Sequence, residues 1–410
     1  MSHPPISYST RPTLRVNLDN LRYNYEAIKK RVGTAKIGAC VKADAYGLGA
    51  AQVSRALYGA GCRIFFVATA GEGKILRDSV GPNSAIYVLN GPSPRDKGVL
   101  LGAKLKPVIN SLEQARFWAQ ISDSVNEPPY TAIHIDTGMN RLGFDEEEFK
   151  EFARDKKLWT SLNPEWVMSH LACAPDKDHP LNAKQLAKFK RAAAQLPMTP
   201  LSLANTAGTY LGKPYHFQMV RPGIGLYGGY ATKNPEQEDI RTVATLLAPI
   251  LQIRNINKGD TLGYDASYTA PRDMQIAVLG AGYADGVPVL ASNKGFATLH
   301  DEAVPIVGRV SMDITMVDIT NVHMHKEVGG VVVFRGDQLE NEAREIGTIN
   351  YEMLTRMGQR LRRDYGKPEK SADTPKPNAR PKNNFQSAKF KKKPSHKSGG
   401  YKKDGFQKRR

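Results

Sequence analysis

The chain has 410 residues, of which 40% are hydrophobic and 24% are charged, and its formal net charge is +18. This length suits two domains with buried cores, and the composition is that of a globular protein. No apolar run approaches the ~18 residues that a membrane-spanning helix needs. The first residues lack the apolar stretch of a secretory signal, so we expect a protein that is neither membrane-embedded nor exported.

The positive charge is concentrated at the C-terminus. Residues 367–410 hold 15 Lys and Arg against 3 Asp and Glu, a charge of +12, which leaves +6 for residues 1–366. The basicity therefore does not mark the whole chain as a nucleic-acid-binding protein. Pro, Lys, Ser, Asn and Gly dominate this tail, so we predict that it is disordered. It is either a solvated extension or a weak binder of RNA or another polyanion through phosphate neutralisation.

The three cysteines are few and scattered. Cys40, Cys62 and Cys173 form no CxxC pair. Such a set is typical of neither a disulfide framework nor a zinc site, so we expect no metal. It fits the reducing environment of the cytoplasm.

Short apolar runs alternate with helix-like segments between Lys36 and about Tyr230. Eight strands, each followed by a crossover, predict an α/β fold with a (β/α)8 TIM barrel, to which we assign residues 1–235. An open doubly wound sheet would need a GxGxxG loop after its first strand, which is not present. Helical spacing of apolar residues marks 52–58, 112–120, 146–154 and 183–195. The predicted strands are Ile37–Val41, Ile64–Ala68, Ile86–Leu89, Lys106–Ile109, Ala132–Ile135, Trp166–Ser169, Leu201–Ala204 and Gly223–Leu226.

The pattern changes after a polar linker at residues 233–239. Short strand-like runs are then separated by Gly, Pro and Asp turns with little helix between them. We therefore predict a smaller, mainly β domain over residues 240–366, closed by a helical stretch at 346–365. Its predicted strands are Leu246–Ile256, Gln275–Leu279, Ala303–Val307, Ile314–Ile319 and Gly330–Phe334.

A lysine follows the first predicted barrel strand, in the segment Val41-Lys42-Ala43-Asp44-Ala45-Tyr46-Gly47-Leu48-Gly49. Barrel enzymes place their active sites at this carboxyl end of the strands, and a lysine with a lowered pKa can form a Schiff base there. The segment resembles the pyridoxal-phosphate (PLP) lysine signature of the alanine racemases, in which Asn and His are more usual at the positions of Asp44 and Leu48. Similar blocks continue in order over roughly residues 12–366.

The resemblance implies that PLP is the cofactor and that Lys42 binds it covalently. The loops after the seventh and eighth strands are the usual phosphate site of a barrel. His170 matches the family histidine that lies against the pyridine ring. The other cofactor-binding residues implied by the resemblance are Tyr46, Asn205, Thr206, Gly223, Ile224 and Tyr351.

Two arginines match family positions. Arg141 matches the arginine that contacts the phenolic oxygen of the cofactor and the substrate carboxylate, which suits a planar guanidinium. Many members have a lysine, sometimes carbamylated, where this chain has His134, so either another acceptor orients Arg141 or it is held less firmly. Arg221 matches the arginine that faces the pyridine nitrogen. Its charge disfavours protonation of that nitrogen, which favours racemisation over other PLP reactions.

The second base implied by the resemblance is Tyr264, in the β domain. A tyrosine with the ordinary pKa of about 10 is a poor base at neutral pH. Hydrogen bonding toward His170, beside Arg221, would favour the phenolate. Lys42 and Tyr264 on opposite faces of the cofactor would then remove and return the Cα proton. In the family, this tyrosine and the substrate-binding Met312–Asp313 region reach the active site of the partner subunit, which implies a homodimer with shared sites.

The activity implied by the resemblance is the interconversion of L- and D-alanine, which in a bacterium supplies peptidoglycan synthesis. One alternative is a racemase of other or broader specificity, such as for serine or lysine. A second is a PLP-dependent decarboxylase, but that class has an acidic residue at the position of Arg221 and a cysteine in the β domain, and no cysteine follows Cys173. A third is a non-catalytic PLP-binding barrel, a class that lacks the β domain.

Overall fold

The computed structural model describes residues 10–127, 129–232, 240–300, 302–322 and 331–366. The predicted linker at 233–239 and the basic tail at 367–410 lie outside the described residues. Within the described part of the chain, no helix is both long enough and apolar enough to cross a membrane.

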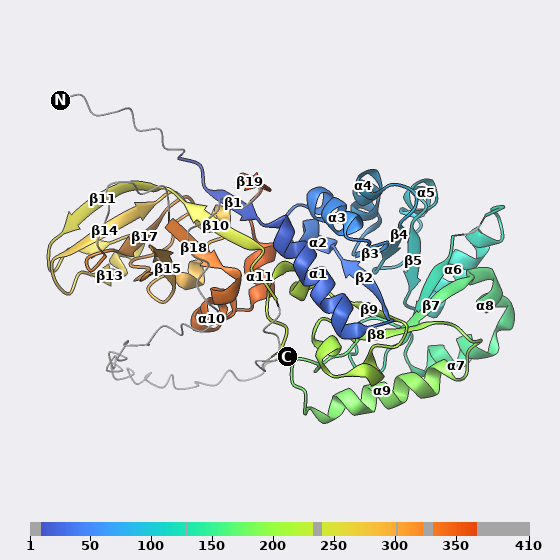
Figure 1. The fold of residues 1–410 in the computed structure, drawn as a ribbon. Coiled ribbons are helices and arrows are strands. Elements are labelled where there is room, and N and C mark those ends of the chain that lie inside the picture. The colour runs from blue at the N-terminus through green and yellow to red at the C-terminus, as the bar shows by residue number, and fades with distance from the viewer. Residues whose placement is uncertain (1–9, 128, 233–239, 301, 323–330, 367–410) are drawn as a thin grey trace, which may run out of the picture. The chain divides into compact units, whose positions relative to one another are not determined.

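In the described part of the chain, eight parallel strands close into a barrel in chain order (Figure 1). The predicted (β/α)8 barrel is therefore confirmed. The eighth predicted strand is wrong, because Gly223–Leu226 enters the 3-10 helix η3 (Ile224–Tyr227), while the strand ends just before Pro222, which has no N–H for a ladder. The barrel strands are β2 (Lys36–Cys40), β3 (Ile64–Val67), β4 (Ala85–Val88), β5 (Lys106–Ile109), β6 (Thr131–His134), β7 (Pro164–Met168), β8 (Leu201–Asn205) and β9 (Met219–Arg221).

Helices in the crossovers follow from local capping and amphipathic patterns. Thr69 and Glu72 form a capping box at the start of α4, Ser111 caps α6 and Asp145 caps α7. Three of the predicted helical segments lie within α3, α6 and α7, and the fourth, 183–195, runs two residues past the end of α9. The helices of this half are α1 (Leu18–Val32), α2 (Lys42–Tyr46), α3 (Ala50–Gly59), α4 (Ala70–Val80), α5 (Lys97–Gly102), α6 (Leu112–Ser122), α7 (Glu146–Arg154), α8 (Lys156–Leu162) and α9 (Pro180–Ala193).

The inside of the barrel is a packed layer of side chains rather than a pore. This layer is a separate buried cluster, in which the Phe66 and Tyr87 rings stack with centroids 5.1 Å apart. It separates the carboxyl ends of the strands from their amino ends. Its buried members are Phe66, Tyr87, Val108, Ala132, Trp166, Met168 and Met219.

The second half is rich in strands, as predicted. A six-stranded sheet has the order β16-β15-β18-β10-β1-β19, and a three-stranded sheet has the order β11-β14-β17. The strands are β10 (Ala244–Ala248), β11 (Ile250–Ile256), β12 (Thr261–Leu262), β13 (Tyr268–Thr269), β14 (Met274–Leu279), β15 (Phe296–Leu299), β16 (Glu302–Pro305), β17 (Thr315–Asp318), β18 (Val331–Arg335) and β19 (Arg362–Asp364).

Three features of this half differ from the sequence prediction. The predicted strand Leu246–Ile256 is two strands, because β10 ends just before Pro249 and β11 lies in the other sheet. The stretch 346–365 is not one helix, because α10 (Gly336–Ile346) and α11 (Asn350–Thr355) are followed by the strand β19. The strand β1 (Thr13–Val16) was not predicted. It pairs antiparallel with β10 and parallel with β19, so the first described strand completes the sheet of the second half before α1 begins (Figure 1).

Candidate active site

Lys42 lies at the start of a left-handed turn directly after β2. Ala43, Asp44 and Ala45 have φ angles of 53°, 52° and 53°, a conformation that costs a non-glycine residue about 1–2 kcal/mol. Two carboxylates hold the turn: Glu72 Oε1 accepts from the Ala43 N–H at 2.8 Å, and Asp44 Oδ1 accepts from the Ala50 N–H at 2.7 Å. The strained turn therefore fixes Lys42 at the carboxyl end of the barrel.

The loops after β8 and β9 contact each other next to this turn. Thr206 Oγ1 accepts from the Gly223 N–H at 2.9 Å and from the Gly225 N–H at 3.4 Å, so the threonine hydroxyl keeps its own proton for another acceptor. A Cβ atom on Gly223 would lie 2.2 Å from Tyr46 Oη. Only glycine fits there, which brings a backbone segment against the tyrosine hydroxyl. Ile224, the next residue, is buried.

Two tyrosines from different halves of the chain lie together at this point. The Tyr46 and Tyr351 ring centroids are 6.3 Å apart, because α11 packs against α2. Burial raises the pKa of Tyr351 to about 12 and the pKa of Tyr46 well above its usual 10. Both hydroxyls therefore stay protonated at neutral pH and can donate hydrogen bonds to an anion.

Arg221 ends β9 with its side chain enclosed, at 3% exposure. Its guanidinium donates to Ser202 Oγ and to the Ser169 carbonyl, and its Nη2 lies 3.4 Å from His170 Nδ1. These partners are neutral and do not cancel its charge. Burial lowers the pKa of Arg221 to about 10, which still leaves the group cationic at neutral pH.

His170 lies between Arg221 and Asn205. Asn205 Nδ2 is 3.4 Å from His170 Nε2, while Asn205 Oδ1 accepts from the Gly208 N–H at 2.9 Å. Burial and then the charges of Arg221 and other nearby cations, including Lys42, lower the pKa of His170 well below 6.5. The ring is therefore neutral. Arg221 Nη2 and Asn205 Nδ2 can both only donate, and a neutral imidazole has one acceptor nitrogen, so at most one of these two contacts is a hydrogen bond.

The tautomer of His134, at the end of β6, is set by its contact with Asn110. Asn110 Nδ2 donates to the carbonyls of Leu89 and Val108, at 3.0 and 3.1 Å, so Asn110 Oδ1 faces His134 Nδ1 at 2.8 Å as an acceptor. Nδ1 must then carry the proton, which leaves Nε2 as an acceptor. Burial, followed by the charge of Arg221, lowers the pKa of His134 to about 3. Arg141 is exposed in the loop beyond.

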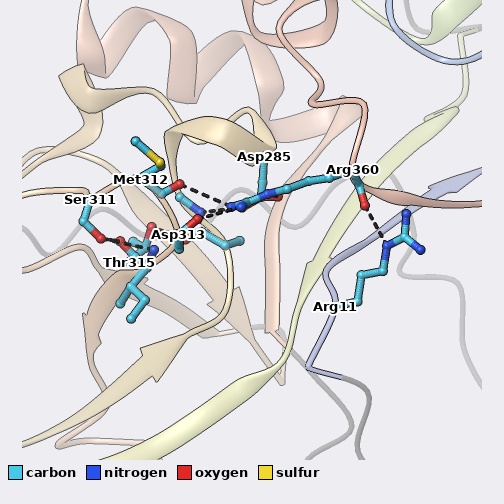
Figure 2. Close-up of polar contacts among 10 residues, drawn as sticks. Arg11, Asp285, Ser311, Met312, Asp313, Thr315 and Arg360 are labelled. Carbon is cyan, nitrogen blue, oxygen red and sulfur yellow. Dashed lines mark hydrogen bonds and ion pairs between the residues drawn. The ribbon is translucent and has the colours of Figure 1, made fainter.

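The predicted residues of the second half face solvent in the single chain. Tyr264 is 70% exposed and Met312 is 53% exposed. Figure 2 shows how the loop of Met312 and Asp313 is held: the Arg360 guanidinium binds both oxygens of the buried Asp285 carboxylate at 2.7 Å and pairs with Asp313 at 2.6 Å. The structure thus gathers the barrel residues around Lys42 but leaves Tyr264, Met312 and Asp313 facing outward.

Sequence reasoning missed three groups that shape this site. Glu72 supports the Lys42 turn, Ser202 orients Arg221, and Arg360 holds the Met312 loop. The Thr69-x-x-Glu72 pattern is a recognisable capping box, but it gives no hint of the second bond to Ala43. The other two contacts join residues far apart in the chain and carry no local signal.

Comparison with known proteins identifies the family. The model for the N-terminal domain of alanine racemase matches residues 16–231, and the model for its C-terminal domain matches residues 243–365. The chain belongs to the alanine racemase family. The alanine racemase of Brucella abortus is 40% identical over 368 residues, covering 86% of this chain and 93% of that protein. That of Rhodospirillum rubrum is 41% identical over 360 residues, covering 86% and 95%.

Solved structures of alanine racemases share the fold. The Bartonella henselae alanine racemase, with covalently bound pyridoxal phosphate, has a TM-score of 0.83 and 34% identity, covering 87% of this chain and 100% of that one. The biosynthetic alanine racemase of Pseudomonas aeruginosa has a TM-score of 0.80 and 29% identity, covering 87% and 100%.

The donor set around Lys42 fits PLP, the cofactor of this family. The cofactor carries a phosphate and a phenolic oxygen, both anionic. The site offers such groups the protonated hydroxyls of Tyr46 and Tyr351 and a Thr206 hydroxyl whose proton is uncommitted. Arg221 adds a positive charge at the end of β9, where the resemblance expects the pyridine nitrogen. Lys42 at the strand end carries an amine of the kind that forms a Schiff base with such a cofactor.

Proposed function

We propose that the chain interconverts L- and D-alanine with PLP held on Lys42, and that Lys42 and Tyr264 are the two bases. The observation that carries the proposal is the buried cation of Arg221, 3% exposed and bound to neutral partners at the end of the strand beside Lys42. When bound, PLP supplies the electron-withdrawing group that weakens the Cα–H bond of the substrate. A cation rather than a carboxylate at this place favours proton return over group transfer.

Each residue of the site then has a limited task. Tyr46, Asn205, Thr206, Gly223, Ile224 and Tyr351 hold the phosphate end, and His170 lies against the ring. Arg141 binds the substrate carboxylate, with the neutral His134 beneath it as a hydrogen-bond acceptor. Lys42 exchanges a proton with one face of Cα, and Tyr264 exchanges one with the other face.

We propose that Tyr264, Met312 and Asp313 act in the site of a second copy, so that the enzyme is a homodimer with shared sites. Their exposure in the single chain supports this. Further large apolar side chains of the same half are also exposed, as expected of a surface that a partner covers. They include Tyr283, Val289, Leu290 and Ile314, with exposures of 36–52%.

A racemisation panel tests the activity. Purified protein with PLP is given each L-amino acid singly, and the D-product is measured by chiral chromatography. D-alanine as the dominant product supports the proposal. If D-serine, D-lysine or a broad set of D-amino acids dominates instead, the enzyme is a racemase of different specificity. No D-product despite bound PLP would refute racemisation. Tyr264→Phe should abolish turnover with PLP retained, whereas the control Tyr268→Phe, four residues on in β13, should stay active.

Mixing two inactive variants tests the shared site. Lys42→Ala and Tyr264→Phe are each expected to be inactive as homodimers. If the sites are shared, a mixed dimer holds one intact site, formed by Lys42 of one chain and Tyr264 of the other. Reassociated mixtures should then regain about one quarter of wild-type activity. No recovery in a mixture shown to contain mixed dimers would place both bases in one chain.

The remaining parts of the proposal concern the cell and the tail. Cys40, Cys62 and Cys173 are free thiols in the structure, which suits a cytoplasmic enzyme that supplies D-alanine for peptidoglycan. We assign residues 1–235 to the barrel domain, 240–366 to the β domain, with β1 in its sheet, and 367–410 to a basic tail that is either a solvated extension or a weak polyanion binder. Unchanged retention on a polyanion column after removal of 367–410 would refute the tail's role.

A further inference from the structure

A basic cavity lies at the amino ends of the barrel strands, the end opposite Lys42. Its volume is about 440 Å³, within the range of small-molecule sites, about 300–1,000 Å³. Lys36 and Lys106 begin β2 and β5, and Arg63 directly precedes β3, so the closure of the barrel gathers their charges. The ionisable side chains that line this basal cavity are Lys36, Arg63, Arg77, Lys104, Lys106, Glu165 and Tyr87.

The one carboxylate in this lining is already committed. Glu165 Oε2 accepts from Lys106 Nζ at 2.5 Å and from the Tyr87 hydroxyl. Five cations against one carboxylate leave the lining strongly positive. A negatively charged ligand would lower the mutual repulsion of these cations.

The two guanidiniums are held in place without being neutralised. Arg77 donates to the backbone carbonyls of Gly81, Ser84, Ala103 and Lys104 at 2.6–3.0 Å, and burial lowers its pKa. Arg63 lies 3.8 Å over the Tyr58 ring and donates to the Tyr58 and Cys62 carbonyls. These carbonyls fix the side chains but carry no net charge. Both side chains are therefore already ordered before an anion binds, so binding would cost little further conformational entropy.

A second surface depression shows what a merely solvated charged face looks like. The larger hollow over α7, of about 870 Å³, is lined by Glu147, Glu148, Glu151 and Asp155 as well as by Lys150, Arg154 and Lys156. Opposite charges alternate there, and Lys150 pairs with Glu146 and Glu147. The basal cavity has no comparable set of carboxylates in its lining.

The basal cavity is separate from the Lys42 site. Tyr87 and Trp166 form its floor and belong to the packed layer that fills the barrel, and both are almost fully buried. A ligand there is therefore neither the cofactor nor the substrate of the site above. A guanidinium favours phosphate oxygens because it binds them in pairs. The carbonyl bonds of Arg63 use Nη1 and leave its Nε and Nη2 for such a pair, whereas Arg77 contributes its charge. We propose that the basal cavity binds a compact polyanion that carries two or more phosphate groups.

Calorimetric titration of the full-length, PLP-loaded protein with inorganic pyrophosphate tests this proposal. The loaded cofactor fills the phosphate site at Lys42, and the binding signal does not depend on racemisation. The test variant is Lys36→Gln with Lys104→Gln, two exposed side chains of the basal cavity. The control variant is Lys150→Gln with Lys156→Gln, which removes the same charge from the α7 hollow.

We expect saturable binding of one pyrophosphate per chain by the wild type and by the control. The basal variant should bind at least about tenfold more weakly while its far-ultraviolet circular dichroism and its PLP absorbance stay unchanged. Three results would overturn the proposal: no saturable binding by the wild type, equal weakening in both variants, or undiminished binding by the basal variant. The last two would assign the binding to the general charge of the protein or to the tail.

Discussion

Replacing Arg360 by methionine should destabilise the β domain and loosen the loop of Met312 and Asp313. The Arg360 guanidinium donates to both oxygens of Asp285, a carboxylate with no exposed surface, and Asp285 also accepts from the Gly282 N–H at 3.0 Å. Arg360→Met removes the charged partner and leaves the carboxylate enclosed with one backbone donor. The same guanidinium reaches the Met312 carbonyl and Asp313, so the loop loses its anchor (Figure 2).

The magnitude follows from the burial of the two partners. Breaking a fully enclosed ion pair costs about 3–5 kcal/mol. The Arg360 side chain is 48% exposed, so water can enter the space that methionine leaves and partly solvate Asp285. We therefore expect the free energy of unfolding to fall by about 2–3 kcal/mol. Both side chains of the Arg360–Asp313 pair are exposed, so Asp313→Asn should lower the free energy of unfolding by less than about 1 kcal/mol.

Urea unfolding at one fixed protein concentration measures this difference, since the proposed dimerisation would make stability concentration-dependent. Amide hydrogen exchange across residues 311–315 should accelerate in Arg360→Met and change little in Asp313→Asn. When Arg360→Met is combined with Asp285→Asn, the free energy of unfolding should fall by less than the sum of the two single effects, because the enclosed charge is gone. Equal destabilisation by Arg360→Met and Asp313→Asn would refute the reasoning that the enclosed carboxylate dominates.

Three further predictions concern the barrel. The pKa of His134 is lowered to about 3, so the unfolded chain binds more protons between about pH 6.5 and 3. As the pH is lowered through this range, the free energy of unfolding should fall by up to about 1.4 kcal/mol per pH unit for this histidine. The lowered pKa of His170 acts in the same direction below pH 6.5. Thr206→Val removes the acceptor of the buried Gly223 N–H and should lower the free energy of unfolding by about 1–3 kcal/mol. It should also lower the fraction of PLP retained, measured by absorbance after dialysis. Gly223→Ala places a Cβ 2.2 Å from Tyr46 Oη and should also lower PLP retention.

Matched variants separate these effects from general damage. His134→Gln should flatten the acid slope by the share of one histidine, and an unchanged slope would mean that His134 titrates normally. Thr206→Ser keeps the hydroxyl and should retain PLP. Gly98→Ala, in α5 with nothing within 4 Å of the added Cβ, should behave as the wild type. Full PLP retention by Gly223→Ala would contradict the close approach of the Gly223 backbone to Tyr46.

The sequence by itself determined the barrel and the placement of its chemistry. Short apolar runs at regular spacing mark buried parallel strands, because such strands are covered on both sides. Once the strands are placed, the groups that follow them must gather at one end of the barrel. Lys42, His170 and Asn205 follow predicted strands and could therefore be grouped at that end. Arg221 precedes the predicted strand Gly223–Leu226, so only the resemblance grouped it with them, and the structure places it at the end of β9.

Only the tertiary structure decided features that join distant parts of the chain. Local periodicity gives no information on which strand pairs with which, so β1 was missed although it pairs with β19 nearly 350 residues later. The turn that replaces the eighth predicted strand has the same apolar content as a strand, but its Gly223 and Gly225 N–H groups donate to the Thr206 hydroxyl rather than to a neighbouring strand. Likewise, the tautomer of His134 depends on Asn110, 24 residues earlier. The charge of the basal cavity exists only because closing the barrel brings separate strand ends together.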